Sequence, residues 1–475
     1  METTTQTLHR LTSYEPGRGW DEPIDDPRVL QDLETNDLGR LPWFYKRYEG
    51  AMSRVALPRD LPPGTASAVA VLAGTADVPP SRMDLAQLSR LLHLSAGVVR
   101  TMERPYGTWL FRAAGSAGGR FPLEVYVSLP GGTGLPAGVH WYDPFDHALV
   151  QVGPVPRGEA PSIVVTGIPW RTGWRYRERG YRHIYWDAGT LLAQLLAVAD
   201  SAGLNASLHG RFPDAAISAL VGADTVHEWP VALVALGDGE PAIHATGPAV
   251  AGDVDASPIE FPMVTAAQRD GDLDTLGPPW HRGAPVDVPA ESSDPIGTVV
   301  LARGSQRLMD PTRGVSERVL RTSLSAALRG VPLPHFVVVH DVEGLGPGVY
   351  RWPDLAAPVR PGPMRDELYR VCLDQALARD AAFVVVAATD VGALDDREYR
   401  EAQLAAGLVE GRLHLLAYAL GASASGMTFI DSEVPALLGE PLDALLFTCV
   451  GVPEYASAAG GPPGAPTAVR RVPER

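Results

Sequence analysis

Residues 303–310 read Arg-Gly-Ser-Gln-Arg-Leu-Met-Asp, and this segment carries the residue types that bind phosphate. Arg303 and Arg307 lie four positions apart, with Ser305 between them. Each guanidinium offers a planar fork of N–H donors to phosphate oxygens, and the serine adds a hydroxyl. The preceding residues 296–302 are β-prone, and a helix that opens after them would add backbone donors and a favourable dipole. The alternative interpretation is a solvated surface, which two arginines and a serine also fit.

The length and composition place the chain among globular proteins of two or three domains. It has 475 residues, of which 45% are hydrophobic and 20% charged, and a formal net charge of −16. These values are ordinary for a protein with large cores, and the acidic balance disfavours nucleic-acid binding. The sequence has no Cys-x-x-Cys pair or His/Cys cluster with metal-ligand spacing, so we expect no metal site.

The sequence also indicates where the protein works. The N-terminal residues 1–8 lack a basic region followed by an apolar run, which argues against a signal peptide. No stretch of about 18 apolar residues is present to span a bilayer. We therefore expect a cytoplasmic protein that does not enter a membrane.

Shifts in composition divide the chain into four parts. Residues 1–80 are rich in Pro, Asp, Arg and aromatic residues and are predicted to form an arm on a larger body. A first body follows at 81–241, and residues 242–293 are rich in loop-forming Gly and Pro and are predicted to be a connector. A second body, with a Gly/Ala/Pro-rich C-terminal tail, occupies 294–475.

An internal repeat relates the two bodies. Residues 134–144 return at 344–354, and the Tyr-Arg pair at 181–182 returns at 399–400, which is 218 positions later. The Ala-Gly pair at 188–189 returns with the same offset. Offsets this steady predict two copies of one domain that pack as an intramolecular pseudo-dimer. The alternative is coincidental similarity in a chain rich in Gly and Ala.

Each copy shows the same succession of predicted elements. An apolar strand, a Gly/Pro hairpin and a second strand precede a long helix of small and aliphatic residues, and a final strand closes the sheet. The helices are predicted at 187–202 and 403–420, and their apolar faces place them in an interface or core. We therefore predict an α+β fold with a central mixed or antiparallel sheet flanked by helices in each copy. The predicted strands lie at 123–129, 230–236, 335–340 and 444–450.

Five segments, taken in order, carry a resemblance to a known family. The chain resembles the FMN-dependent nitroreductase superfamily and, within it, the SagB-type (thiazole/oxazole) peptide dehydrogenases in a tandem-domain form. The segments are the residues 88–97, 112–126, 180–189, 303–307 and 425–431.

The resemblance implies that FMN binds between the two copies. The second copy would supply the phosphate grip of Arg303, Ser305 and Arg307, and the first copy a partner loop before its first central strand. A loop near the flavin ring and a basic C-terminal residue would complete the site. The other residues implied to bind FMN are Ser116, Ala117 and Gly118 of the partner loop, Ser425, Gly426 and Met427 of the ring loop, and Arg470 or Arg471.

The reciprocal site is predicted to be lost. The first copy has no arginine at residues 72–80, where its own phosphate grip would lie, and the second copy has Arg-Gly-Val-Pro-Leu-Pro at 329–334 in place of a Ser-Ala-Gly loop. One FMN site per chain is therefore expected. His209, in the first copy's counterpart of the ring loop, is either a further site residue or a histidine of the degenerate site.

Arg175 and Tyr176 are the implied catalytic pair, because azoline-oxidising relatives place a Lys-Tyr pair in a similar segment as the base. A guanidinium stays protonated near neutral pH and cannot abstract a proton. Tyr176 can act if the neighbouring cation lowers its pKa. The alternative is that this Arg/Tyr/Trp-rich segment packs and solvates an interface.

Three functions remain open from the sequence. The first is an FMN-dependent peptide dehydrogenase that oxidises thiazoline or oxazoline to azole with dioxygen as electron acceptor, on a peptide delivered with a cyclodehydratase partner. The second is a nitro- or ene-reductase or another small-molecule dehydrogenase, which arginine in place of lysine favours. The third is a degenerate scaffold in a biosynthetic complex, which the Arg303/Ser305/Arg307 trio disfavours.

Overall fold

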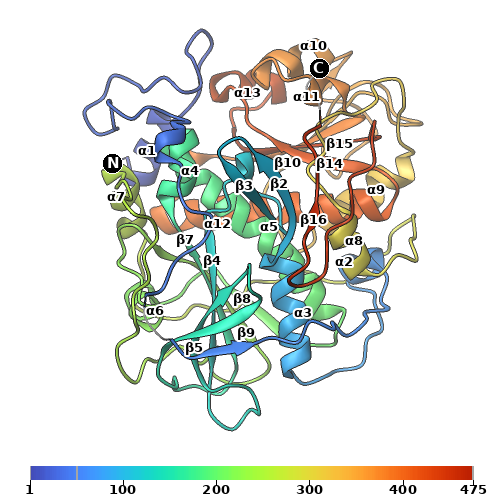
Figure 1. The fold of residues 1–475 in the computed structure, drawn as a ribbon. Coiled ribbons are helices and arrows are strands. Elements are labelled where there is room, and N and C mark those ends of the chain that lie inside the picture. The colour runs from blue at the N-terminus through green and yellow to red at the C-terminus, as the bar shows by residue number, and fades with distance from the viewer. Residues whose placement is uncertain (1, 50–51, 473–475) are drawn as a thin grey trace.

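The computed structural model describes residues 2–49 and 52–472, and its elements form two main sheets around a pair of long helices (Figure 1). The first sheet has the strand order β1-β6-β5-β4-β7-β9-β8, and every neighbouring pair in it is antiparallel. Its strands are β1 Arg54–Ala56, β4 Leu123–Leu129, β5 Gly138–Asp143, β6 Ala148–Gly153, β7 Ser162–Gly167, β8 Ala206–His209 and β9 Trp229–Leu236.

The second sheet has the strand order β12-β11-β10-β13-β15-β14 and is also antiparallel. Its strands are β10 His335–Val339, β11 Gly348–Arg351, β12 Arg360–Pro361, β13 Phe383–Thr389, β14 Ser423–Met427 and β15 Asp443–Gly451. The central strands β7 and β13 are buried at every residue, as strands covered on both faces must be. The predicted α+β class and the four predicted strands are confirmed.

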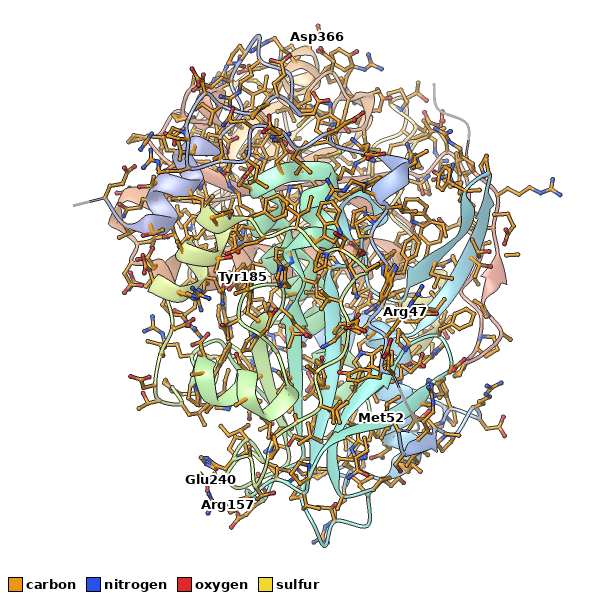
Figure 2. All side chains as sticks on the ribbon, turned by 60° about the vertical axis from the view of Figure 1, so that its left-hand side comes forward. Arg47, Met52, Arg157, Tyr185, Glu240 and Asp366 are labelled. Atoms are coloured by element: carbon orange, nitrogen blue, oxygen red, sulfur yellow. The ribbon has the colours of Figure 1, made fainter. Side chains whose placement is uncertain are left out.

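The helices lie between and around the sheets. Figure 2 shows Tyr185 inside this helical layer, with Arg157 and Glu240 at one end of the molecule and Asp366 at the other. Among the described residues, no helix is both long and apolar enough to cross a membrane. The helices are α1 Thr4–Leu11, α2 Ala68–Ala73, α3 Leu85–Ala96, α4 Pro169–Tyr176, α5 Gly180–Asp200, α6 Asp214–Val221, α7 Pro262–Asp270, α8 Ile296–Ala302, α9 Glu317–Ala327, α10 Arg365–Val371, α11 Ala376–Asp380, α12 Asp396–Ala419 and α13 Val434–Leu438.

The two sheets repeat one topology. Leaving out the edge strand β1, the order β6-β5-β4-β7-β9-β8 corresponds strand by strand to β12-β11-β10-β13-β15-β14. A long helix follows β7 and β13 alike, and a short helix precedes the closing strand of each sheet. Both short helices, α6 and α13, end at a left-handed glycine, Gly222 with φ 72° and Gly439 with φ 71°.

The long helices α5 and α12 pack against each other in the register of the sequence repeat. Tyr181 and Tyr399, which are 218 positions apart, stack with ring centroids 6.4 Å apart and an interplanar angle of 7°. At the same offset, a Cβ on Gly411 would lie 2.7 Å from the Cβ of Ala193. Because residues 218 positions apart meet at both points, the two helices run parallel. Parallel helices are what an approximate two-fold axis that runs along the helix direction would produce.

A small sheet joins the C-terminal tail to the first half. Strand β2 (Val98–Arg104) pairs antiparallel with β3 (Gly107–Arg112) and parallel with β16 (Thr467–Ala468). In this pairing Thr467 lies opposite Arg100. The tail of the second half therefore lies along the surface of the first.

Two predictions about local structure were wrong. The β-prone residues 296–302 form the helix α8, because their buried residues Ile296, Val299 and Val300 recur at helical spacing. The helices α5 and α12 begin at residues 180 and 396, about two turns before the predicted starts at 187 and 403. The first turns of both helices contain buried polar residues. A prediction that recognises a helix by its apolar residues therefore starts the helix too late.

Candidate functional site

Arg303 is a buried arginine that the protein holds through two of its three guanidinium nitrogens. Its Nε donates a hydrogen bond to Oε1 of Gln194 at 2.7 Å, and its Nη2 donates to the carbonyl of Ala113. The third nitrogen, Nη1, is buried and has no hydrogen-bond partner in the described structure. A buried donor without a partner costs free energy unless a ligand accepts from it.

The surroundings of Arg303 favour an anion. Burial, followed by the positive charge of Arg100, lowers the pKa of Arg303 to about 10, so the guanidinium remains charged at neutral pH. Within the described ranges, no carboxylate forms a salt bridge with Arg303 at 4.0 Å or less. Glu410 attracts this charge only at longer range, and a buried cation without a salt bridge suits a phosphate or another anion.

Arg303 ends a helix rather than opening one. The helix α8 stops at Ala302, and the backbone N–H of Arg303 donates to the carbonyl of Val299. The segment therefore does not provide the helix N-terminus that would add affinity for anions.

Two segments from different halves of the chain meet at this arginine. A Cβ on Gly115, in the loop before β4, would lie 3.5 Å from Nη1 of Arg303 and 3.7 Å from Oγ of Ser305. Ser305 and Arg307 are exposed, and the backbone N–H of Arg307 donates to the hydroxyl of Tyr455 at 3.2 Å. The loop that contains Ser116 and the segment that contains Arg303 thus face each other.

The Ser116 loop is fixed by Asp187 on α5, which the sequence analysis did not select. The hydroxyl of Ser116 donates to Asp187 at 2.5 Å, and the backbone N–H of Ala117 donates to the same carboxylate at 3.0 Å. Burial raises the pKa of Asp187 well above its usual range. The hydroxyl of Ser116 and the backbone N–H of Ala117 are therefore already occupied by hydrogen bonds within the protein.

Arg175 and Tyr176 lie against the same loop. Gly118 has a positive φ of 59°, and a Cβ placed on it would lie 2.7 Å from the Tyr176 hydroxyl and 2.7 Å from Cδ of Arg175. Nη1 of Arg175 donates to Oδ1 of Asn36 at 3.3 Å, so the N-terminal arm also contacts this pair. Sequence positions about 60 residues apart are thus brought into direct contact.

The protonation of Tyr176 differs from the prediction. Burial raises the pKa of Tyr176, and this effect outweighs the lowering by the Arg175 cation. The condition under which Tyr176 could act as a base, a pKa lowered by the neighbouring cation, is therefore not met, and the phenol is neutral near pH 7. In this form Tyr176 is a hydrogen-bond donor rather than a base.

His183 is a second residue that the sequence analysis missed. Its ring packs edge-on against Tyr176 with centroids 4.1 Å apart and stacks on Trp186 at 4.6 Å. Neither ring nitrogen has a hydrogen-bond partner in the described structure. Burial and the nearby arginines lower the pKa of His183 well below its usual range, so the imidazole is neutral.

Residues 425–427 lie in a strand and not in a loop. Ser425 and Met427 are buried in β14, whereas Gly426 is half-buried beside the carboxylate of Glu410 on α12. The backbone N–H of Gln306 donates to the carbonyl of Ala424 at 3.1 Å, so β14 lies beside the segment of Arg303. The predicted loop is therefore wrong, and the role of these residues near the flavin ring stays a prediction.

The C-terminal arginines follow a strand that lies close to Arg303. Arg100 donates through Nη2 to the carbonyl of Arg303 at 2.9 Å, and Thr467 of β16 lies opposite Arg100. Arg470 and Arg471 are exposed just beyond this strand.

His209 has a structural role. It is buried in β8, and its Nδ1 lies 3.0 Å from the carbonyl of Gly277, with which it can share a hydrogen bond. Burial lowers its pKa, so the ring is neutral and ties the connector to the first sheet.

Part of the first half of the chain matches a known protein family. Residues 154–238 match the model of the Nitroreductase family. This segment includes β7, α4, α5, β8, α6 and β9, and therefore Arg175, Tyr176 and Asp187.

Known proteins extend the likeness. A nitroreductase-like protein of Methanocaldococcus jannaschii is 28% identical over 172 residues, which cover 33% of this chain and 82% of that protein. The crystal structure of a nitroreductase-like protein of Anabaena variabilis superposes with a TM-score of 0.73 at 24% identity, covering 96% of this chain and 100% of the other. A chain of the E. coli microcin synthetase McbBCD complex overlaps at a TM-score of 0.28 and 16% identity, which carries no argument about the reaction.

These comparisons give the chain a mixed α+β, nitroreductase-like fold over nearly its whole length. The nitroreductase part of the resemblance is confirmed. The SagB-type assignment and the roles of individual residues stay predictions, because a shared fold hosts many reactions.

Proposed function

We propose that this protein is an FMN-dependent oxidoreductase with one cofactor site per chain, between its two halves. One observation carries the proposal: the buried Nη1 of Arg303 lacks a partner and lies beside Ser305 and Gly115. A phosphate at this point would accept from the guanidinium and from the Ser305 hydroxyl, and the absence of a side chain on Gly115 leaves room for it. The residues therefore fit the phosphate of FMN.

The proposal includes a tandem pair of nitroreductase-like domains, at 81–241 and 294–475, that pack as two subunits of a dimer would. The shared strand order and the parallel helices α5 and α12 support it. The segment after α2, which corresponds to the segment after α8, has no arginine at residues 74–80. This asymmetry supports one cofactor per chain rather than two.

FMN, when bound, supplies the two-electron redox chemistry. The chain's own residues hold the cofactor and handle the proton. Arg303 and Ser305 would hold the phosphate, and Arg470 or Arg471 would add a positive charge beside it. Tyr176 holds a proton on its phenol oxygen, and Arg175 keeps a fixed positive charge beside that oxygen.

Our first candidate reaction is the oxidation of an azoline ring to an azole on a peptide substrate, with dioxygen as the electron acceptor. The place of Arg175-Tyr176 in the sequence resemblance and their contact with Gly118 support it. A cyclodehydratase that forms the azoline would be the partner. This reaction requires a base for the ring proton, which Arg175 cannot be.

The second candidate is the reduction of a nitro group or an activated double bond on a small molecule. The raised pKa of Tyr176 favours it, because a neutral phenol can donate a proton to a reduced substrate. A non-catalytic scaffold is the weakest alternative, since a scaffold has no use for the uncompensated charge of Arg303.

The first test is the flavin content of the purified chain. We expect a yellow protein that releases one FMN per chain on denaturation. Colourless protein that gains no flavin absorbance on titration with FMN would refute the proposal. Two FMN per chain would refute the single-site arrangement only.

The second test separates the reactions. The FMN-loaded protein is given a thiazoline peptide with dioxygen, or NAD(P)H with a nitroaromatic compound. A mass loss of about 2 Da in the peptide, measured under single-turnover conditions, supports the dehydrogenase. Consumption of NAD(P)H without peptide oxidation supports the reductase.

A further inference from the structure

A hollow of about 700 Å³ lies on the side of α12 that faces the connector. Its walls come from three parts of the chain: the helix α12 and the residue Leu394 before it, the loop before β10, and residues 278–281 of the connector. Gly210 and Arg211, at the end of β8, complete the lining. The volume lies within the range of small-molecule sites.

The hollow occupies the place in the second half that the Tyr176 site occupies in the first. The register of α5 and α12 pairs Leu394 with Tyr176, Glu401 with His183 and Ala405 with Asp187, each 218 positions apart. The loop before β10 corresponds in the same way to the loop before β4 that contains Gly118. The chain therefore has two related sites, one in each half.

The second site has lost the features that favour phosphate. Ala405 stands where Asp187 anchors the Ser116 loop, and the segment after α2 has no arginine. Apolar residues provide much of the remaining wall, including Leu333, Leu394 and Ala402. These walls favour a ligand that presents mainly apolar surface.

Trp280 provides an aromatic wall that the backbone fixes in place. Its backbone N–H donates to the carbonyl of Leu208 at 2.6 Å, and its Nε1 donates to the carbonyl of Gly330 at 3.2 Å. The indole is only half-buried and lines the hollow. A Cβ on Gly210 would lie 3.6 Å from the indole and 3.4 Å from the Glu401 carboxylate, so both groups border one corner.

The charge at the mouth of the hollow is negative. Arg211 forms hydrogen bonds with both oxygens of Glu401, the nearest at 2.7 Å. The hydrogen bond with Glu401 raises the pKa of Arg211, with smaller contributions from Asp395 and Glu398. Glu401 neutralises Arg211, and Asp395 and Glu398 add further negative charge nearby, which favours a cation.

We infer that this hollow binds a small planar aromatic amine in its protonated form. The ring would pack against Trp280 between apolar walls, and the ammonium would lie near Glu398 at the mouth. Binding in this hollow depends on its own lining residues and does not require FMN in the first site.

The test is a titration of the full chain with tryptamine, followed by calorimetry, with indole-3-acetate as the anionic counterpart of similar shape. We expect tryptamine to bind saturably below ~10 mM and more tightly than indole-3-acetate by about threefold to tenfold. Absence of saturation, or equal binding of the two compounds, overturns the inference.

Variants locate the binding. Trp280→Ala should weaken tryptamine binding by about tenfold, whereas Trp280→Phe should retain most of it, since the ring is what matters. Glu398→Gln should reduce the preference over indole-3-acetate, and it keeps an oxygen for the backbone N–H of Asp395 at the start of α12. Trp20→Ala, which removes a ring 6.4 Å from that of Tyr176 in the other site, should change neither. Unchanged binding in both Trp280→Ala and Glu398→Gln would overturn the inference even if tryptamine binds.

Discussion

A Cβ on Gly118 would lie 2.7 Å from the hydroxyl of Tyr176. The loop before β4 therefore approaches the end of α4 so closely that only the hydrogen atom of a glycine fits at this position. This contact joins the partner loop to the proposed catalytic residue. Because Gly118 also has a positive φ of 59°, any other residue there would strain the backbone as well. The position of the Tyr176 hydroxyl therefore depends on a glycine about 60 residues earlier.

Replacement of Tyr176 by phenylalanine tests its role. If the phenol donates a proton, Tyr176→Phe should lower kcat by about 10² to 10⁴-fold and leave FMN bound. The wild-type rate should stay flat from pH 6 to ~9 and fall only at higher pH, because burial raises the pKa of Tyr176 above 10 and ionisation then removes the proton.

Steady-state kinetics across this pH range provide the measurement, and Tyr106→Phe at an exposed position is the control. A rate that climbs steadily between pH 7 and 10 would instead identify the phenolate as a base.

Arg303 should dominate cofactor affinity. Removal of a charged hydrogen-bond donor costs about 1.5 to 3 kcal/mol, so Arg303→Ala should weaken FMN binding by ~10 to 150-fold. Arg303→Lys should recover part of the affinity, since it restores the charge without the planar fork.

Fluorescence titration of the apoprotein with FMN measures the effect, with the exposed Arg313→Ala as the matched control. Full FMN retention in a double Arg303→Ala, Arg307→Ala variant would refute the single-site proposal.

The contact between the central helices should tolerate no added methyl group. A Cβ on Gly407 would lie 2.7 Å from Cα of Trp186, within the backbone of the opposite helix. Gly407→Ala should therefore destabilise the fold by about 3 kcal/mol or prevent it from forming.

Urea unfolding compares this variant with Gly131→Ala, where no atom lies within 4 Å of the added methyl group. Equal midpoints for the two variants would contradict the close packing of α5 against α12.

Asp431 should make stability depend on acid pH. It accepts hydrogen bonds of 2.6 Å from both Arg179 and Arg182, which belong to the other half of the chain. Although burial opposes ionisation, these two cations hold the pKa of Asp431 below its ordinary value of 3.8. The contribution of Asp431 to the free energy of unfolding is therefore complete above about pH 5, and it is lost as the pH falls through and below 3.8.

Asp431→Asn should cost about 3 to 5 kcal/mol at pH 7, because it leaves two buried cations without a counterion, and should flatten the acid limb of the stability curve. Chemical unfolding between pH 3 and 7 measures both effects. Asp26→Asn, in an exposed pair with Arg28, should change little.

Some parts of the fold were predictable because their signals are local or repeated. The strands β9 and β15 show as apolar runs, and the repeat offset of 218 anticipates the register of α5 against α12. The residues 296–302 were not predictable from β propensity, since packing of three buried side chains at helical spacing overrides it.

The sequence by itself determined the α+β class, the repeat offset and the presence of one Arg-Gly-Ser-Gln-Arg segment, because composition, period and repeat are properties of the linear chain. Only the tertiary structure decided the state of the site. It placed Asp187 on the Ser116 loop, left one nitrogen of Arg303 without a partner, and buried Tyr176. The physical reason is that desolvation depends on every segment packed around a group, and the segments around Tyr176 include residues from the arm, the Ser116 loop and α5.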